Sequence, residues 1–282
     1  MNAELQWFPA PGKLNLFLHV VGRRADGYHL LQTALRLVDR ADRIGVRVRT
    51  DGQILRTREP PGISAAEDLC LRAAKAIRER SGTPLGAEIV LEKILPVGGG
   101  MGGGSSDAAT VLIVLNRLWN LGLSRAELLD LALGLGADVP VFVFGGNALA
   151  EGIGERLTPL CLPPAWYLVL TPQVSVSTKE IFTHPALTRD SKTLKLPAFF
   201  AGQGRNDLEP VACGLYPAVA EHLAWLKSHG EARVTGSGAS VFAGYASESL
   251  ARAVHVQLPP NMRGFVTRGL ERHPLADWIP DR

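Results

Sequence analysis

One segment of the chain has the composition of a loop that binds phosphate. It consists of Pro96, Val97, Gly98, Gly99, Gly100, Met101, Gly102, Gly103, Gly104, Ser105 and Ser106. Because glycine loses more conformational freedom on folding than any other residue, a glycine run indicates a backbone that must approach something closely. Between a strand and a helix, such a loop directs backbone N–H groups at one anion, and Ser105 and Ser106 add hydroxyls that can cap the helix. The segment therefore predicts a polyphosphate site; the alternative, a flexible turn, needs only one or two glycines.

The loop differs from the two common nucleotide motifs. A Walker loop ends in Gly-Lys-Ser/Thr, and no lysine stands here. The pattern G-x-G-x-x-G occurs at Gly98, Gly100 and Gly103, but any glycine run produces it. A dinucleotide fold also needs a following strand with an acidic residue about 20 positions on, whereas a second helix is predicted here. These differences argue against a dehydrogenase.

Two further residues have the chemistry of phosphoryl transfer. Asp138 stands between a predicted helix and a predicted short strand, where its carboxylate could take a proton from a hydroxyl that attacks phosphorus. Lys13 could stabilise charge on the phosphate or keep that carboxylate ionised. The alternatives are a turn or helix-capping aspartate and a solvated surface lysine. The position of Lys13 on an amphipathic strand weakens the second alternative.

The predicted elements place these residues. Residues 13–21 alternate as a strand, so Lys13 and Asn15 point the same way. Further strands are predicted over residues 44–48, 87–94, 141–144, 166–171, 233–235, 241–245 and 263–268, and helices over 67–80, 107–121, 125–135, 208–229 and 247–256. Strands and helices mix throughout, which is typical of an α+β or two-layer α/β protein. A Pro-containing connection near residues 157–164 predicts two domains, 1–155 and 156–282.

Composition narrows the class of protein. The 282 residues carry a net charge of +3 and 6% aromatics, which argues against a nucleic-acid partner. The arginines between Arg23 and Arg58 form either a basic face for an anionic substrate or a solvated strand edge. No segment has the roughly 18 apolar residues of a membrane span, and the start does not resemble a signal peptide. Three scattered cysteines, with no C-x-x-C, indicate reduced thiols and a cytoplasmic protein.

Five segments together resemble the GHMP kinase superfamily over nearly the whole chain. They are Pro11-Gly-Lys-Leu-Asn15, Asp26-Gly-Tyr-His29, residues 96–109, Gly136-Ala-Asp-Val-Pro140 and Thr235-Gly-Ser-Gly-Ala-Ser240. Many members have alanine at the position of Gly12, which is also small. The resemblance implies an α+β fold with an N-terminal ATP-binding domain, a C-terminal domain and an active site in the cleft between them.

Residues 22–29, with Gln32 and Thr33, are similar to one branch of that superfamily. The branch uses ATP to phosphorylate the 2-hydroxyl of 4-diphosphocytidyl-2-C-methylerythritol, on the non-mevalonate route to isoprenoid precursors. The resemblance implies that Lys13 and Asp138 are the catalytic pair and that residues 96–106 hold the ATP phosphates. It also implies five residues that meet the substrate: Asn15, Tyr28, His29, Thr178 and Phe182. The match is looser around Thr178 and Phe182.

The chemistry of these types agrees with a cytidine ligand. A tyrosine ring can stack on a pyrimidine, and histidine and asparagine can each donate and accept, as the edge of cytosine requires. The alternatives are a tyrosine packed on the core and a histidine with a loop hydrogen bond. Magnesium is expected with ATP; the sequence identifies no protein ligand for it, and Asp107 and Glu151 are two possible ones. Two other functions remain open: a kinase for mevalonate, homoserine or a sugar, and a nucleotide-binding module without catalysis.

Overall fold

The computed structural model describes residues 4–57 and 68–280, which form two sheets with helices packed against them. The larger sheet has the order β3-β4-β2-β5-β6, with β1 paired to β2. All its pairs are antiparallel except β3 with β4. Its strands are β1 (Gln6–Arg23), β2 (His29–Arg49), β3 (Ile54–Arg56), β4 (Gly86–Glu92), β5 (Ala148–Gly152) and β6 (Arg156–Pro159).

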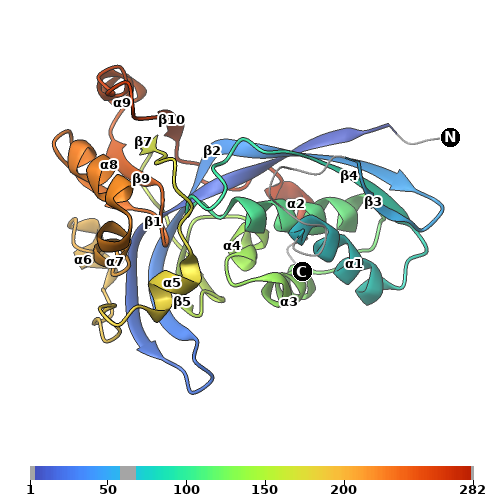
Figure 1. Cartoon of the computed structure of the whole chain (residues 1–282). Coiled ribbons are helices and arrows are strands. Elements are labelled where there is room, and N and C mark those ends of the chain that lie inside the picture. Colours follow the sequence, from blue (N-terminus) through green and yellow to red (C-terminus); the bar gives the residue numbers. More distant parts are fainter. Residues whose placement is uncertain (1–3, 58–67, 281–282) are drawn as a thin grey trace.

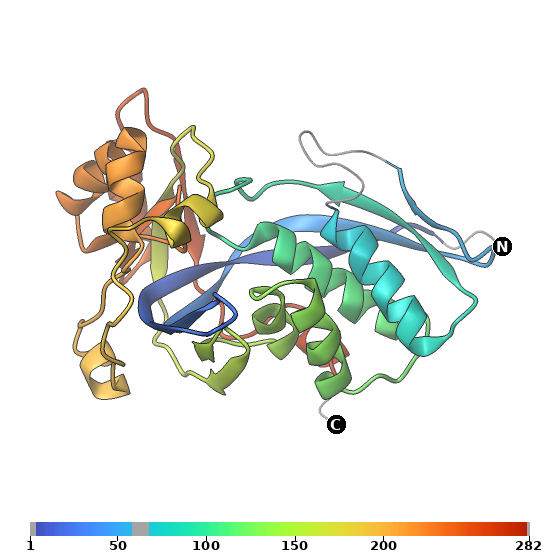
Figure 2. The ribbon, with the colours of Figure 1, turned by 60° about the horizontal axis from the view of Figure 1, so that its bottom comes forward.

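Four helices pack against one face of this sheet, as the cyan and green ribbons in Figures 1 and 2 show. They are α1 (Leu69–Ser81), α2 (Gly103–Leu118), α3 (Arg125–Leu135) and α4 (Val139–Phe144). Helix α2 is central, since its residues from Ser106 to Asn116 are all buried. The largest core cluster of the molecule lies between these helices and the sheet. This core fixes the position of the glycine loop, because the loop leads directly into α2.

The second sheet belongs to the C-terminal half and has the antiparallel order β10-β7-β9-β8. Its strands are β7 (Trp166–Leu170), β8 (Ala232–Val234), β9 (Val241–Tyr245) and β10 (Gly264–Arg268). The helices of this half are α5 (Thr178–Thr183), α6 (Leu196–Phe200), α7 (Glu209–Leu215), α8 (Pro217–Lys227) and α9 (Glu248–His255), followed by a 3₁₀ turn, η1 (Ala276–Trp278). The long strands β1 and β2 extend from the first half to the second (Figure 1). The predicted α+β class is confirmed, and no described helix is long and apolar enough to cross a membrane.

Two element predictions were wrong. Residues 141–144 belong to helix α4, because Pro140 begins a helical turn and Gly145 ends it in the left-handed region. A short, fully buried apolar run fits either structure, so its pattern could not separate them. The predicted helix over 208–229 is two helices, which meet at Tyr216 before Pro217. The first residue of the predicted helix 67–80 lies outside the described residues; the described helix begins after the Asp68 cap.

The arginines of the first half do not form one basic face. Several pair with acids of the neighbouring strand β4, as Arg43 does with Glu92 and Arg47 with Glu88. Arg36 is fully buried and donates to the Pro163 carbonyl. Arg58, the last of the predicted set, lies outside the described residues. These arginines are therefore divided between ion pairs across the sheet and buried positions.

The end of the chain returns to the first half. Leu270 donates its N–H to the Leu37 carbonyl at 2.8 Å, and Trp278 packs edge-on against Phe8 with ring centroids 5.2 Å apart. Strands β5 and β6, which flank residue 155, also pair with each other. The division into 1–155 and 156–282 stays a prediction.

His273, in this returning segment, predicts an acid-sensitive stability. Its side chain is buried, and its Nδ1 accepts the N–H of Leu275 at 3.0 Å, so the imidazole is neutral. Burial lowers the pKa of His273 to about 4. Below the unfolded-state pKa of about 6.5 the unfolded chain therefore binds the proton more readily, and stability is lost as the pH falls towards 4. The full contribution is roughly 3 kcal/mol.

Urea unfolding between pH 7.5 and pH 5 would measure this effect. The free energy of unfolding should fall more steeply with acid in the wild type than in His273→Asn, whose side-chain oxygen can still accept the Leu275 N–H. Equal slopes in the two proteins would contradict the assignment.

Candidate active site

A cleft of about 840 Å³ lies between the two halves and collects the residues singled out in the sequence. Every predicted site residue lines it except Ser106, which is buried behind it. The lining thus combines Lys13 of β1, the glycine loop, Asp138 and the start of α5. Residues from distant parts of the chain therefore share one cavity.

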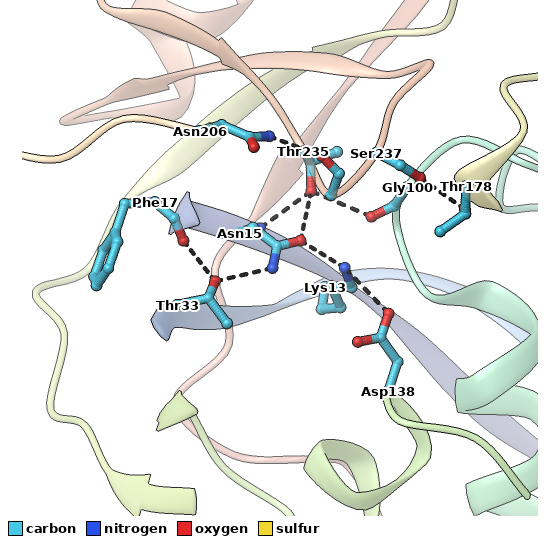
Figure 3. A network of polar contacts seen from close by, with 11 residues as sticks. Lys13, Asn15, Phe17, Thr33, Gly100, Asp138, Thr178, Asn206, Thr235 and Ser237 are labelled. Carbon is cyan, nitrogen blue, oxygen red and sulfur yellow. Dashed lines mark hydrogen bonds and ion pairs between the residues drawn. The ribbon is translucent and has the colours of Figure 1, made fainter. Parts of the chain in front are cut away.

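Lys13 and Asp138 form the central charged pair (Figure 3). The Lys13 Nζ lies 3.4 Å from Asp138 Oδ2, with the lysine side chain 3% exposed and the aspartate 50% exposed. Nζ also donates to Asn15 Oδ1 at 2.6 Å, which confirms that Lys13 and Asn15 point the same way. Asp138 occupies the N-cap position of α4 but makes no side-chain cap hydrogen bond. Its carboxylate therefore faces the cleft and does not cap the helix. Lys13, in turn, is not a surface lysine.

A buried polar network fixes the orientation of Asn15 (Figure 3). Its Nδ2 donates to Thr33 Oγ1 at 2.9 Å, and Thr33 in turn donates to the Phe17 carbonyl at 2.5 Å. Its backbone N–H donates to Thr235 Oγ1 at 3.1 Å, and that hydroxyl lies 3.3 Å from the Gly100 carbonyl. Because the side-chain oxygen, the side-chain nitrogen and the backbone N–H of Asn15 each have a partner, the residue holds Lys13 in one place.

The glycine loop is held between β1 and the turn after β8. Lys13 donates its N–H to the Met101 carbonyl at 2.9 Å, while Ala239 donates to Gly98 at 3.1 Å and Ser240 to Gly99 at 3.2 Å. Gly100 has φ +73°, and a Cβ on it would stand 2.1 Å from the Thr235 carbonyl oxygen. A side chain at this position would separate the loop from residues 235–240. The glycine is therefore required by close backbone approach.

The loop ends at the N-terminus of α2. Gly102 is the N-cap, in the left-handed region, and makes no side-chain cap hydrogen bond. The expected cap by Ser105 or Ser106 is wrong, because the helix already begins at Gly103 and both serines lie within its first turn. A helix N-terminus without a side-chain cap leaves its N–H groups and its positive dipole end available to an anion.

A buried charged cluster lies behind the loop. Lys93 donates to Asp107 Oδ2 at 3.0 Å and also pairs with Asp42. Burial raises the pKa of Asp107 to about 8, and the nearby Lys93 opposes that rise. Because Asp107 is buried, pairs with Lys93 and does not line the cleft, it does not suit a magnesium ion there. Glu151, the other candidate, accepts from Gln32 at 3.3 Å and does not line the cleft.

The far end of the cleft is aromatic. Tyr28 is 60% exposed on the loop between β1 and β2, so it is not packed on the core. The rings of His29 and Phe182 lie 5.1 Å apart at 37°. Thr178 shares a 2.8 Å hydrogen bond with Ser237, which links α5 to the turn after β8. The two most loosely matched residues thus lie in the cleft with the others.

Some contributors carried no sequence signal of their own. Asn206 is buried, and its Nδ2 donates to the carbonyls of Val234 and Gly236 at 2.8 Å each. It lies in an irregular segment, and nothing in its local pattern indicates a role. Thr235 belonged to a recognised segment, but its contact with Asn15 depends on how the halves pack.

Comparison with known proteins places the chain in a family. The model described as "GHMP kinases N terminal domain" matches residues 68–146, and "GHMP kinases C terminal" matches residues 184–263. A protein of Nitrosospira multiformis named 4-diphosphocytidyl-2-C-methyl-D-erythritol kinase is 60% identical, covering 98% of this chain and 95% of its own length. A protein of Thiobacillus denitrificans with the same name is 58% identical, covering 98% and 99%.

Solved structures agree with this placement. The structure titled "Crystal structure of 4-(cytidine 5'-diphospho)-2C-methyl-D-erythritol kinase" is 36% identical with a TM-score of 0.81, covering 94% of this chain and 100% of that one. A homoserine kinase of Cytophaga hutchinsonii, 18% identical with a TM-score of 0.67 over 95% and 94% of the two chains, shares the fold. With both domain models matched and relatives similar over almost the full length, the chain belongs to the GHMP kinase family of small-molecule kinases.

Proposed function

We propose that this kinase transfers the γ-phosphoryl group of ATP to the 2-hydroxyl of 4-diphosphocytidyl-2-C-methylerythritol, giving ADP and the 2-phosphate on the non-mevalonate route to isoprenoid precursors. The observation that carries the proposal is the Lys13–Asp138 pair, 3.4 Å apart, in a cleft that has the glycine loop on one side and the Tyr28, His29 and Phe182 rings on another. Relatives 55–60% identical are named for this reaction.

In this proposal Asp138 and Lys13 act on the reacting hydroxyl. The half-exposed Asp138 carboxylate accepts the hydroxyl proton as the oxygen attacks phosphorus. The ammonium of Lys13 stabilises the charge that develops on the phosphoryl oxygens. Asn15 holds the lysine through its 2.6 Å hydrogen bond.

The glycine loop and the start of α2 bind the ATP phosphates through backbone N–H groups. Magnesium fits this site as a companion of the nucleotide, because Mg²⁺ keeps several waters and needs only one or two protein carboxylates beside the phosphates. Asp138 is the acid of the cleft lining beside the loop that could serve it; the other lining acid, Asp26, pairs with Arg24 at 2.7 Å. When bound, the ion neutralises phosphate charge.

The cytidine end of the substrate lies at the aromatic end of the cleft. The exposed Tyr28 ring stacks on the pyrimidine, His29 and Asn15 hydrogen-bond to polar groups of the substrate, and Thr178 and Phe182 complete the wall. The partners are thus small molecules. We also propose a cytoplasmic location, which the three unpaired cysteines support.

ADP release tests the reaction directly. Purified protein with Mg-ATP is offered 4-diphosphocytidyl-2-C-methylerythritol, mevalonate, homoserine or galactose, beside a control without acceptor. Release only with the cytidyl substrate supports the proposal. Release with another alcohol would show a kinase with a different substrate. ATP binding without any ADP release would favour a nucleotide-binding module.

Tyr28→Ala should raise the KM for the cytidyl substrate about tenfold or more, because loss of a base–aromatic stack costs roughly 1–3 kcal/mol. The KM for ATP should change little, since Tyr28 stands at the other end of the cleft from the loop. Steady-state kinetics with each substrate varied in turn would measure both constants. Equal increases in the two KM values would remove Tyr28 from the cytidine site.

A further inference from the structure

Arg189, in the turn that follows α5, is an unassigned residue with four hydrogen bonds. Its Nη1 donates to the Leu187 carbonyl at 3.0 Å, and its Nη2 donates to the carbonyls of Phe182 at 3.1 Å and His184 at 2.8 Å. Its Nε donates to His29 Nε2 at 3.2 Å. One guanidinium therefore ties the end of α5 to the first residue of β2. Both connected segments contribute a ring to the cleft, Phe182 and His29.

The contact with Arg189 determines where the proton of His29 resides. Arginine has only donors, so the Nε2 that faces it must be unprotonated. A neutral imidazole then carries its proton on Nδ1. Burial, Arg189 and Arg23 each lower the pKa of His29, and these two arginines are the charged groups near the ring. Both the geometry and the charges favour a neutral His29 with a fixed Nδ1–H donor.

A fixed donor can distinguish the two common pyrimidines. Cytosine presents N3 and O2 as acceptors, whereas uracil carries a proton on N3. An imidazole with Nδ1–H can donate to N3 of cytosine but leaves two donors facing each other with uracil. A site built around a hydrogen bond discriminates strongly against a ligand that cannot make it, because its buried polar group is left unpaired.

We propose that Arg189 is a positioning residue that fixes the tautomer of His29 and thereby makes the kinase prefer a cytidine over a uridine substrate. Arg189 acts through His29 and through the Phe182 backbone, not by touching the base. The part of this inference that concerns substrate preference rests on the proposed function. The tautomer itself can be measured without any substrate.

The first test is ¹⁵N NMR of the full-length protein with labelled histidine, and His29→Gln identifies the signal. The wild type should show His29 protonated on Nδ1 at pH 7.5. Arg189→Met should lose that fixed tautomer and raise the pKa of His29. Arg23→Met is the matched control: Arg23 donates to the Gly27 carbonyl and not to His29, so its loss should raise the pKa while the Nδ1–H tautomer stays. A wild-type His29 protonated on Nε2 would overturn the proposal.

The second test compares kcat/KM for the cytidyl substrate and its uridyl analogue. Arg189→Met should lower the preference for cytidine at least about tenfold, equal to 1.4 kcal/mol, mainly through the KM of the cytidyl substrate. If this variant does not fold, Arg189→Lys serves instead, because a single ammonium keeps the charge but cannot bridge four acceptors. Unchanged preference in a folded variant overturns the role in specificity. Wild-type inactivity with the cytidyl substrate would instead sink the proposed function and leave the NMR result standing.

Discussion

Asp138→Asn is expected to lower kcat by about 10²–10⁴-fold, the usual contribution of a positioned general base. The amide has nearly the same shape as the carboxylate, which lies 3.4 Å from the Lys13 ammonium. A neutral amide is not basic enough to accept the hydroxyl proton. Because Asp138 makes no cap hydrogen bond to α4, the change should leave the helix and the stability intact. ATP affinity measured without magnesium should be nearly unchanged, since the phosphate loop binds through its own backbone N–H groups.

Steady-state ADP release and calorimetric titration with ATP would measure the two effects separately. Asp130→Asn is the matched control: it makes the same change of charge on an aspartate of α3 whose side chain is 74% exposed. That variant should retain wild-type turnover. A kcat of Asp138→Asn within a few-fold of wild type would remove the residue from proton transfer and leave it a role in positioning alone.

Gly100→Ala is expected to weaken ATP binding by roughly ten- to a hundredfold, corresponding to about 1–3 kcal/mol. At φ +73° an alanine is strained, and its Cβ would stand 2.1 Å from the Thr235 carbonyl oxygen. The loop must then move away from residues 235–240, which misaligns the N–H groups that face the phosphates. The same movement disturbs the Thr235 contact with Asn15 and should lower kcat as well.

Calorimetric titration with ATP and thermal unfolding would follow both consequences. Gly134→Ala provides the comparison, because Gly134 lies within α3 with nothing within 4 Å of an added Cβ. Alanine there should stabilise the protein by about 0.5–1 kcal/mol and leave ATP binding unchanged. Wild-type ATP affinity in Gly100→Ala would show that the close approach to Thr235 is dispensable for the nucleotide site.

Much of this site could be predicted from the sequence, because it depends on local rules. The glycine run required close backbone approach wherever it folded, and the period of two along a strand put Lys13 and Asn15 on one side. The order of the five family segments was enough to predict the family and the cleft. The sequence could not determine whether residues 141–144 form a helix or a strand, since a short buried apolar run suits both.

The tertiary structure alone decided how these parts are joined. Thr235 meets Asn15 across 220 positions, and Arg189 meets His29 across 160. It also decided that Asp107, next to the serines of the loop, faces Lys93 and the core instead of the cleft. Periodicity fixes which side of its own element a residue occupies. Which distant residue lies opposite depends on the packing of the two sheets and their helices, and no local spacing in the chain encodes that packing.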